Sequence, residues 1–521
     1  MKKISFMIAA LLVAMTGCQK EPQVNPENNP GSNAEAVGYV SLKISLPSST
    51  ATRATDTDFS DGEANGNEYK VNDVTIVFYG EDGAYQETVT VEPDPIWNNN
   101  AADDITVSGK TPAIPVKNAV KQALVLVNAS GLITKFDYPT YSAFNSALES
   151  TIAQVIGTDE APDFFMSNEP YYKDGKFTTL VSVDVKPTAT QALEAAKNVK
   201  VERAAAKVTV KFDNTKYVNA ENESKAVVKG WNLDVTNKSF YPVRQGYDSN
   251  AANEWFTGAD TPANQSIIGL SRIYWAKDPN YAEGNITGET LSAFNRVTEG
   301  DLTLGNNAFA YCLENTFNTN CMNENQTTTV MLKANYVPKD INEDETWFMV
   351  GPGKTVYSAA GLVEYIKSKL TAEQVATVPA DLANTLSANA GEVEDVMVAE
   401  RNSVMLNDLV GEVICYKDGI CYYPVKVRHF TAEELGYADE AEFKNSFEGV
   451  GAMDPGYKTN DLGRYGVLRN TWYNITVNSI KNPGSPVIPD PIDNPDDKFE
   501  QFVACTIDIL AWSVRNHGVD L

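Results

Sequence analysis

The sequence predicts a mainly β protein in which a few helices lie on the connections between strands. Runs rich in Val, Ile, Thr and aromatic residues recur along the chain, and Gly, Asn, Asp and Pro separate them, which is typical of strands and turns. Helical spacing of apolar residues is rarer. With 521 residues, of which 43% are hydrophobic, the chain is long enough for two or three domains with buried cores.

The predicted strands fall into two blocks. The first block contains 40–46, 73–79, 86–91, 122–127, 178–185 and 200–212, and the second contains 327–337, 410–417, 421–429 and 473–480. Apolar residues at helical spacing predict helices within 141–156 and 358–370. Capping boxes that begin at Thr188 and Thr431 predict two more.

The first residues have the features of an export signal. Residues 1–3 are basic and 4–14 are apolar, a pattern typical of a secretory signal peptide and too short for a stable membrane helix. The residues before Cys18 resemble a bacterial lipoprotein processing site, which predicts that Cys18 is lipidated. The next twenty or so residues, rich in Asn, Pro, Glu and Gln, suit a flexible tether.

The stretch 40–46 has the alternation of a half-buried strand. Its apolar members are Val40, Leu42, Ile44 and Leu46, with polar residues between them. Arg53 follows in a run of small polar residues that cannot pack, which leaves the bond between Arg53 and Ala54 open to a trypsin-like protease. Each buried aliphatic side chain contributes about 1.5–3 kcal/mol. Loss of this strand would therefore open a core and require a replacement.

The end of the chain carries a segment that matches this strand in length and phase. Its alternating apolar residues are Val503, Cys505, Ile507 and Ile509. A Pro-rich spacer at 482–495, extended and semi-rigid, precedes it. We expect the segment to be held away from its own domain and to add to an open sheet of another copy, which gives a head-to-tail fibre.

The net charge limits the classes of ligand, and the number of cysteines limits the disulfides that can form. The formal charge of −27 argues against nucleic acid and anionic lipid as ligands. Besides Cys18 the chain has five cysteines, so at most two disulfides form within a subunit. A three-residue loop around Asp418 would set Cys415 opposite Cys421 in a hairpin, which makes them the main candidate disulfide, ahead of Cys312 with Cys321.

Motifs for metals, nucleotides and catalysis are incomplete. The run 353–355 lacks the first Gly of a phosphate-binding loop, and 56–67 lacks the Gly and final Glu of a calcium loop. Two histidines and no Cys-x-x-Cys pair argue against zinc. We interpret His429 as structural, and Trp231, Trp275 and Trp472 as core anchors. The sequence thus predicts no cofactor, no metal site and no enzyme activity.

Several motifs together resemble the fimbrillin shaft subunits of the type V pili of Bacteroidia, closest to the minor-fimbrium type. They are VERAAAK at 201–207, WNLDVTNK at 231–238, YWAKDPNY at 274–281, YCLENT at 311–316, CYYPVKVRHF at 421–430 and RYGVLRN at 464–470. The resemblance covers nearly the whole chain. It implies two transthyretin-like β-sandwich domains, export as a lipoprotein, cleavage after Arg53 by a trypsin-like protease, and polymerisation by donor-strand exchange.

The expected organisation follows from this resemblance. It places a lipoprotein signal peptide at 1–17, a tether and removable strand at 18–53, an N-terminal sandwich at 54–243, a C-terminal sandwich at 244–480, a spacer at 481–498 and a donor strand at 499–521.

The expected function is that of a fimbrial shaft subunit that supports adhesion, biofilm formation and host colonisation. It would pass the outer membrane as a lipoprotein and end in a cell-surface fimbrium. Its partners would be other copies of itself, the protease, anchor and tip subunits, and host or bacterial surface receptors. The alternatives are a tip or adaptor subunit, or a monomeric surface lipoprotein that binds glycans through exposed Trp.

Overall fold

The computed structural model describes the chain in several stretches. They are 38–45, 68, 70–93, 108–146, 148–158, 163–173, 176–215, 217–219, 222–245, 275–281, 293–317, 321–351, 353–369, 403–405, 412–446, 457, 461–490 and 503–511. Within them strands dominate, so the predicted mainly β class is confirmed. No helix in these stretches has the length and hydropathy of a membrane span.

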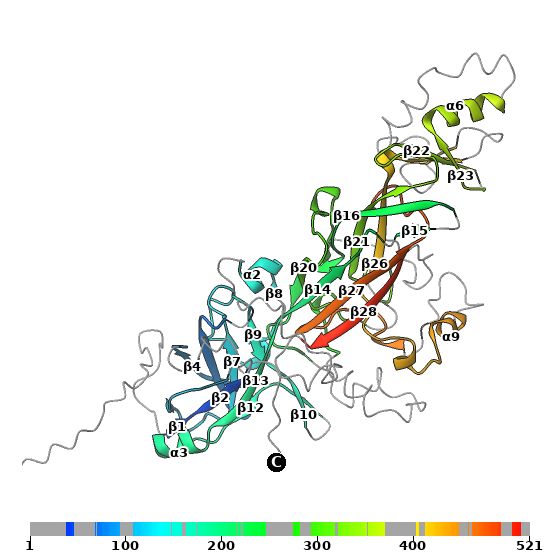
Figure 1. The fold of residues 1–521 in the computed structure, drawn as a ribbon. Coiled ribbons are helices and arrows are strands. Elements are labelled where there is room, and N and C mark those ends of the chain that lie inside the picture. Colours follow the sequence, from blue (N-terminus) through cyan, green and yellow to red (C-terminus); the bar gives the residue numbers. More distant parts are fainter. Residues whose placement is uncertain are drawn as a thin grey trace, which may run out of the picture.

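The N-terminal lobe is built on one sheet of eight strands (Figure 1). Its order is β4 (Tyr85–Val91), β3 (Val74–Tyr79), β7 (Gln122–Val127), β9 (Met166–Asn168), β13 (Lys197–Arg203), β2 (Leu42–Ser45) and β5 (Ser108–Lys110), with β12 (Val181–Ser182) also paired to β7. A short ladder of β1 (Gly38–Val40) with β6 (Ile114–Val116) continues the β2–β5 pair. The strands β1 and β2 are therefore the N-terminal end of the described chain and lie inside this lobe.

The C-terminal lobe is a sandwich of two four-stranded sheets. One has the order β20 (Phe309–Leu313), β14 (Ala205–Lys211), β27 (Thr471–Ile480) and β28 (Val503–Ala511). The other has the order β15 (Val218–Asn219), β16 (Ser224–Asp234), β21 (Thr329–Val337) and β26 (Ile420–Lys426). A single cluster of buried side chains, which includes Val208, Trp231, Leu332 and Ile475, lies between them.

A smaller lobe is inserted between β21 and β26. It contains the sheet β23 (Thr355–Ser358), β22 (Trp347–Val350), β25 (Glu412–Tyr416) and β24 (Ser403–Met405), and helix α6 (Ala359–Ser368). Leu362 and Ile366 of α6 pack with Phe348 in a separate core. In Figure 1 this lobe lies at the end of the molecule opposite the N-terminal lobe.

The remaining elements are short. The helices are α1 (Tyr141–Phe144), α2 (Ile152–Ile156), α3 (Ala189–Glu194) and α9 (Glu440–Asn445), with 3-10 turns η3 (Pro279–Tyr281), η5 (Glu299–Asp301), η7 (Lys417–Gly419) and η8 (Glu433–Leu435). The strands are β8 (Leu148–Glu149), β10 (Tyr171–Lys173), β11 (Lys176–Thr178), β17 (Thr236–Asn237), β18 (Ser239–Phe240) and β19 (Phe294–Asn295). The helices predicted at Thr188 and within 358–370 are confirmed, whereas 141–156 contains two helices separated by β8.

The two main lobes divide earlier than the sequence predicts. β13 belongs to the N-terminal sheet and β14 to the C-terminal one, and only the buried Ala204 lies between them. The predicted boundary at 243/244 therefore differs from the division of the sheets. The reason is that 200–212 has the pattern of one continuous strand, which gives no sign that the chain passes from one sheet to another within it.

Ion pairs between buried side chains hold the lobes together. Glu202, at the end of β13, binds Arg244 at 2.8 Å, and Glu314 binds Arg469 at 2.9 Å. Burial raises the pKa of Glu202 to about 7, although the charge of Arg244 opposes this shift. Each arginine also bonds a backbone carbonyl, Arg244 that of Arg469 and Arg469 that of Tyr241. Such buried pairs fix geometry, since breaking one leaves an uncompensated charge.

Glu68 forms a further buried pair that joins strands of both lobes. Its carboxylate lies 2.8 Å from the Lys207 ammonium of β14 and accepts a hydrogen bond of 2.6 Å from the Tyr311 hydroxyl of β20. Its backbone carbonyl accepts a bond of 3.1 Å from Arg203 of β13. The side chains of Glu68 and Lys207 are each 1% exposed. Glu68 is thus anchored where the N-terminal and C-terminal lobes meet.

We expect Glu68→Gln to lower the free energy of unfolding by about 3–5 kcal/mol, because the Lys207 charge would stay buried without its partner. Chemical denaturation of the two proteins would measure the difference. Glu343→Gln, which breaks solvent-exposed pairs with Lys225 and Lys229, is the control and should leave stability nearly unchanged. Equal effects of the two variants would contradict the anchoring role.

Candidate functional site

Strand β2 lies between two neighbours in the N-terminal sheet. It runs parallel to β13, with Ile44 opposite Val199, and antiparallel to β5, with Ile44 opposite Gly109. Among the described strand pairings, β5 pairs with β2 alone and β6 pairs with β1 alone. The stretch that contains β5 and β6, which runs antiparallel to β1 and β2, is therefore connected to the rest of the sheet through these two strands.

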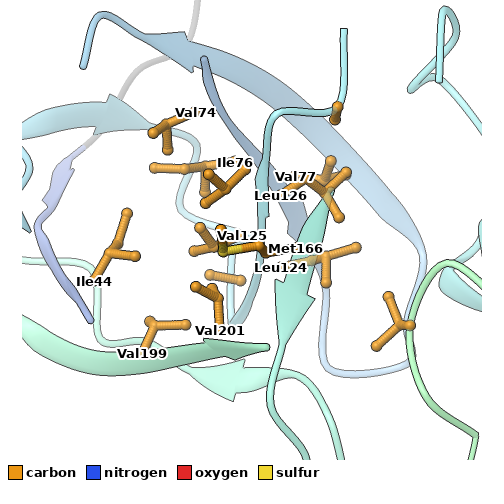
Figure 2. Close-up of a cluster of buried hydrophobic side chains, with 14 of the residues drawn as sticks. Ile44, Val74, Ile76, Val77, Leu124, Val125, Leu126, Met166, Val199 and Val201 are labelled. Carbon is orange, nitrogen blue, oxygen red and sulfur yellow. The ribbon is translucent and has the colours of Figure 1, made fainter. Parts of the chain in front are cut away.

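The buried face of this strand agrees with the predicted alternation where the structure describes it, whereas Ser41, predicted to lie on the wet face, is also buried. Val40, Leu42 and Ile44 are 2%, 0% and 0% exposed, and Lys43 is exposed. Figure 2 shows Ile44 among Val74, Ile76, Val199 and Val201 in the core of the lobe. These three aliphatic side chains contribute about 1.5–3 kcal/mol each, which together approaches the roughly 5–15 kcal/mol of a whole domain.

A polar corner lies where β1 passes into β2. The Ser41 hydroxyl donates a hydrogen bond of 3.0 Å to the Thr111 carbonyl, and the Thr111 hydroxyl accepts one of 2.9 Å from the Leu42 amide. Ser41 is 2% exposed and Thr111 is 1% exposed. The position of Ser41 therefore accepts only a small side chain, a restriction that alternation alone does not reveal.

Backbone also approaches closely at the start of β1. A Cβ atom added to Gly38 would lie 2.4 Å from Val185 Cγ1 and 2.7 Å from the Lys186 carbonyl oxygen. The next residue, Tyr39, exchanges backbone hydrogen bonds of 2.7 and 2.8 Å with Lys186. We call the space that residues 38–45 fill, with β13 on one side and β5 and β6 on the other, the β2 seat.

Four predicted site residues lie outside the part of the chain that the structure describes. They are Cys18, Leu46, Arg53 and Ala54. The described chain resumes at the anchored Glu68, after the expected cleavage site. Nothing in the sequence pattern identified Glu68 as an anchor, because its partners Lys207 and Tyr311 are far from it along the chain.

The C-terminal segment forms strand β28, which pairs along its length with β27 of its own chain. Val503, Cys505, Ile507 and Ile509 have their backbones opposite Ile480, Val477, Ile475 and Tyr473. The strand is antiparallel and lies at the edge of its sheet, as Figure 1 shows. The prediction of a strand is confirmed, but the expectation that it is held away from its own domain is wrong in this structure.

The first half of the Pro-rich spacer is bound to the C-terminal lobe, so it does not extend away from this lobe as predicted. The hydroxyls of Tyr416 and Tyr423 donate hydrogen bonds to the carbonyls of Gly484 and Asn482, at 3.3 and 3.1 Å. Ser485 exchanges backbone bonds of 3.0 and 2.8 Å with Tyr422. We call residues 481–490 the strap. The sequence pattern missed it because tyrosines on distant strands supply its donors.

The candidate disulfide between Cys415 and Cys421 is not formed. Cys312, Cys321, Cys415 and Cys421 are all free and buried. Strand β25 pairs with β22 and β24, whereas β26 pairs with β21, so η7 connects two different sheets and does not close a hairpin. Cys415 consequently lies in the core of the small lobe and Cys421 in that of the sandwich.

The buried thiols are poor nucleophiles. Burial raises the pKa of Cys312 and of Cys421 to about 12, so both stay protonated at neutral pH. His429 is 3% exposed and lies 2.8 Å from the Tyr473 hydroxyl, and Trp231, Trp275 and Trp472 are buried, which confirms their structural roles. In the described part of the chain no three His, Cys, Asp or Glu side chains are grouped so as to hold a metal.

Comparison with known proteins agrees with the predicted resemblance. Residues 452–517 match the family model described as major fimbrial subunit protein type IV, fimbrillin, C-terminal. This region includes β27, the strap and β28, and the resemblance to fimbrillins is confirmed there. No curated protein matches the chain.

Three solved structures are similar in outline. They are a "putative cell adhesion protein" of Parabacteroides distasonis (TM-score 0.43, 10% identity, 93% of this chain and 99% of that one), one so described from Bacteroides eggerthii (0.38, 12%, 92% and 98%), and the tip fimbrial protein Mfa3 of Porphyromonas gingivalis with a C-terminal truncation (0.34, 11%, 91% and 100%). At these scores the likeness carries no argument about function.

We expect Gly484→Ala to detach the strap, because the added Cβ would lie 2.4 Å from the Tyr422 carbonyl oxygen and 2.8 Å from the Tyr423 ring. Overpacking of this kind costs about 1–3 kcal/mol. Limited proteolysis should then cut residues 481–490 faster than in the unaltered protein. The control is Gly305→Ala, since a Cβ there meets no atom within 4 Å. Equal cleavage rates would show that the strap is not held by this contact.

Proposed function

We propose that this chain, which shares the C-terminal region of the fimbrillins, is a structural subunit of a bacterial surface fimbrium. It is exported as a lipoprotein through Cys18 and crosses to the cell surface by way of the outer membrane. A trypsin-like protease cuts between Arg53 and Ala54 and so removes the strand that fills the β2 seat. The β28 segment of a second copy then fills the seat, and repetition gives a head-to-tail fibre.

The observation that carries this proposal is the place of the first two strands. β2 lies inside a sheet between β13 and β5, and β1 pairs with β6 and bridges to Lys186. Both strands precede the candidate cleavage site in the chain. Their removal would leave a groove lined by core residues such as Val199 and Val201. A groove of this kind binds an extended segment through backbone hydrogen bonds on both sides and pockets for alternate side chains.

The connection to β28 supports its release. Antiparallel neighbours are usually joined by roughly two to five residues, but residues 481–502 join β27 to β28. Because β28 lies at the edge of its sheet, it has one neighbouring strand in its own chain. In the β2 seat it would have two. The seat therefore offers the strand a neighbour on each side, and residues 491–502, beyond the strap, leave it length of chain with which to move.

We propose the role of a shaft subunit, with anchor and tip subunits and surface receptors as further partners and with adhesion and biofilm formation as its biological role. A donor strand that can leave its own domain suits a subunit that continues the fibre, which favours the shaft over the tip. The protein acts by assembly and not by catalysis.

A monomeric glycan-binding lipoprotein is the second candidate. It needs aromatic side chains on the surface, but the described tryptophans, Trp231, Trp275, Trp347 and Trp472, are 0–5% exposed. This observation favours the fimbrial role.

Two measurements test the assembly proposal. The protein recovered from the cell surface should begin at Ala54, and treatment of the purified precursor with a trypsin-like protease should give high-mass ladders on unboiled gels. Deletion of residues 499–521 should abolish the ladders. A surface protein that retains lipidated Cys18 at its N-terminus would contradict the processing step, and ladders from the deletion variant would contradict the donor role.

Ile507→Asp should stop assembly while the uncut monomer stays folded, because a charge would enter an apolar groove. Thr506→Asp is the matched control, since the neighbouring position along a strand faces the opposite side of the sheet. We expect ladders from the Thr506 variant and none from the Ile507 variant, with the same circular dichroism for both precursors. Ladders of equal strength would contradict the predicted face.

A further inference from the structure

We propose that the incoming strand enters the β2 seat in the same direction as the strand it replaces, with Val503, Cys505 and Ile507 in the places of Val40, Leu42 and Ile44. This inference rests on the proposed strand exchange and specifies the register and polarity of the contact between copies. Alternation alone permits both directions, because Val503, Cys505, Ile507 and Ile509 fit four alternate pockets in either order.

The sequences of the two segments agree position by position in the same direction. Residues 39–46 read YVSLKISL and residues 502–509 read FVACTIDI. An aromatic residue comes first in both, Val and Ile recur at the second and sixth positions, and a small residue occupies the third. The fifth position, which is the exposed Lys43 in the seat, carries the polar Thr506.

The corner at Ser41 distinguishes the two directions. In the same direction Ala504 takes the place of Ser41, so a small side chain enters the buried corner against Thr111. In the opposite direction Asp508 would enter it. A carboxylate there would face the Thr111 carbonyl oxygen, which is 3.0 Å from the Ser41 hydroxyl and cannot donate a hydrogen bond, and the Thr111 hydroxyl, 3.5 Å from that of Ser41, could donate at most one. A buried carboxylate with so few donors is strongly unfavourable.

The other end of the seat gives Asp508 a better place. In the same direction it replaces Ser45, which is half-buried and lies opposite Lys200 of β13. Lys200 is exposed. Opposite charges directly across two strands attract each other. Asp508 therefore makes a favourable contact in the same direction and an unfavourable one, at the Ser41 corner, in the opposite direction.

Gly38 limits how far the incoming strand extends. The same direction would bring Gln501 to this position and the opposite direction would bring Ala511, and the Cβ atom of either would meet Val185 and Lys186 at 2.4 and 2.7 Å. Neither residue fits at this position, so Gly38 does not distinguish between the two directions. The incoming strand therefore leaves the sheet before the position of Gly38, where its chain comes from the spacer.

Disulfide trapping tests the direction, with Cys505 as a native probe. In the same direction Cys505 lies at the place of Leu42, opposite Lys197; in the opposite direction it lies at the place of Ile44, opposite Val199. Neighbouring strands bring paired Cα atoms within the range that a disulfide spans. We would prepare Lys197→Cys and Val199→Cys in the full chain, start assembly with protease, and oxidise the fibres.

We expect fibres of Lys197→Cys to become resistant to boiling and to be released by reductant, whereas those of Val199→Cys stay sensitive to boiling. Adding Cys505→Ser to Lys197→Cys should abolish the crosslink. Trapping by Val199→Cys, or by neither variant although ladders form, would overturn the proposed direction or register. If the unaltered chain forms no ladder at all, the proposed function itself fails.

Discussion

The packing of β2 between β13 and β5 is the constraint on which the rest of the structure depends. An edge strand can be lost with little change, but this strand connects β5 to the sheet and places Leu42 and Ile44 in the core. Its loss removes hydrogen bonds on both sides and several kcal/mol of apolar burial. A subunit that loses it must acquire another strand or stay open to aggregation.

The anchor at Glu68 allows such a loss to remain local. Because Glu68 binds Lys207 and Tyr311 where the two lobes meet, the chain after the proposed cleavage site is held independently of β1 and β2. The ion pairs of Glu202 with Arg244 and of Glu314 with Arg469 also lie at the junction, outside the seat. In the proposed exchange the two lobes would therefore keep their arrangement while the seat changes its occupant.

Sequence patterns predicted the parts of this protein that depend on local periodicity. The alternation of Val40, Leu42 and Ile44 gave the strand and its buried face, and the alternation of 503–509 gave the last strand. The patterns failed where distant segments decide the outcome. They suggested a hairpin with Cys415 facing Cys421, because they carry no information that the two strands pair with β22 and β21. The strap was missed for the same reason, since its donors are tyrosines on β25 and β26.

The position of β28 is consistent with the proposal that one chain stores a strand and then donates it. On β27 the strand has one neighbour, and the strap fixes the chain as far as residue 490, so the part that must move is short. Leaving β27 exposes a ladder edge, which opposes spontaneous release. Entry into an open seat supplies two ladders and a core in return. In the proposed exchange, burial in the open core would therefore favour the transfer, and an occupied seat would keep β28 on its own domain.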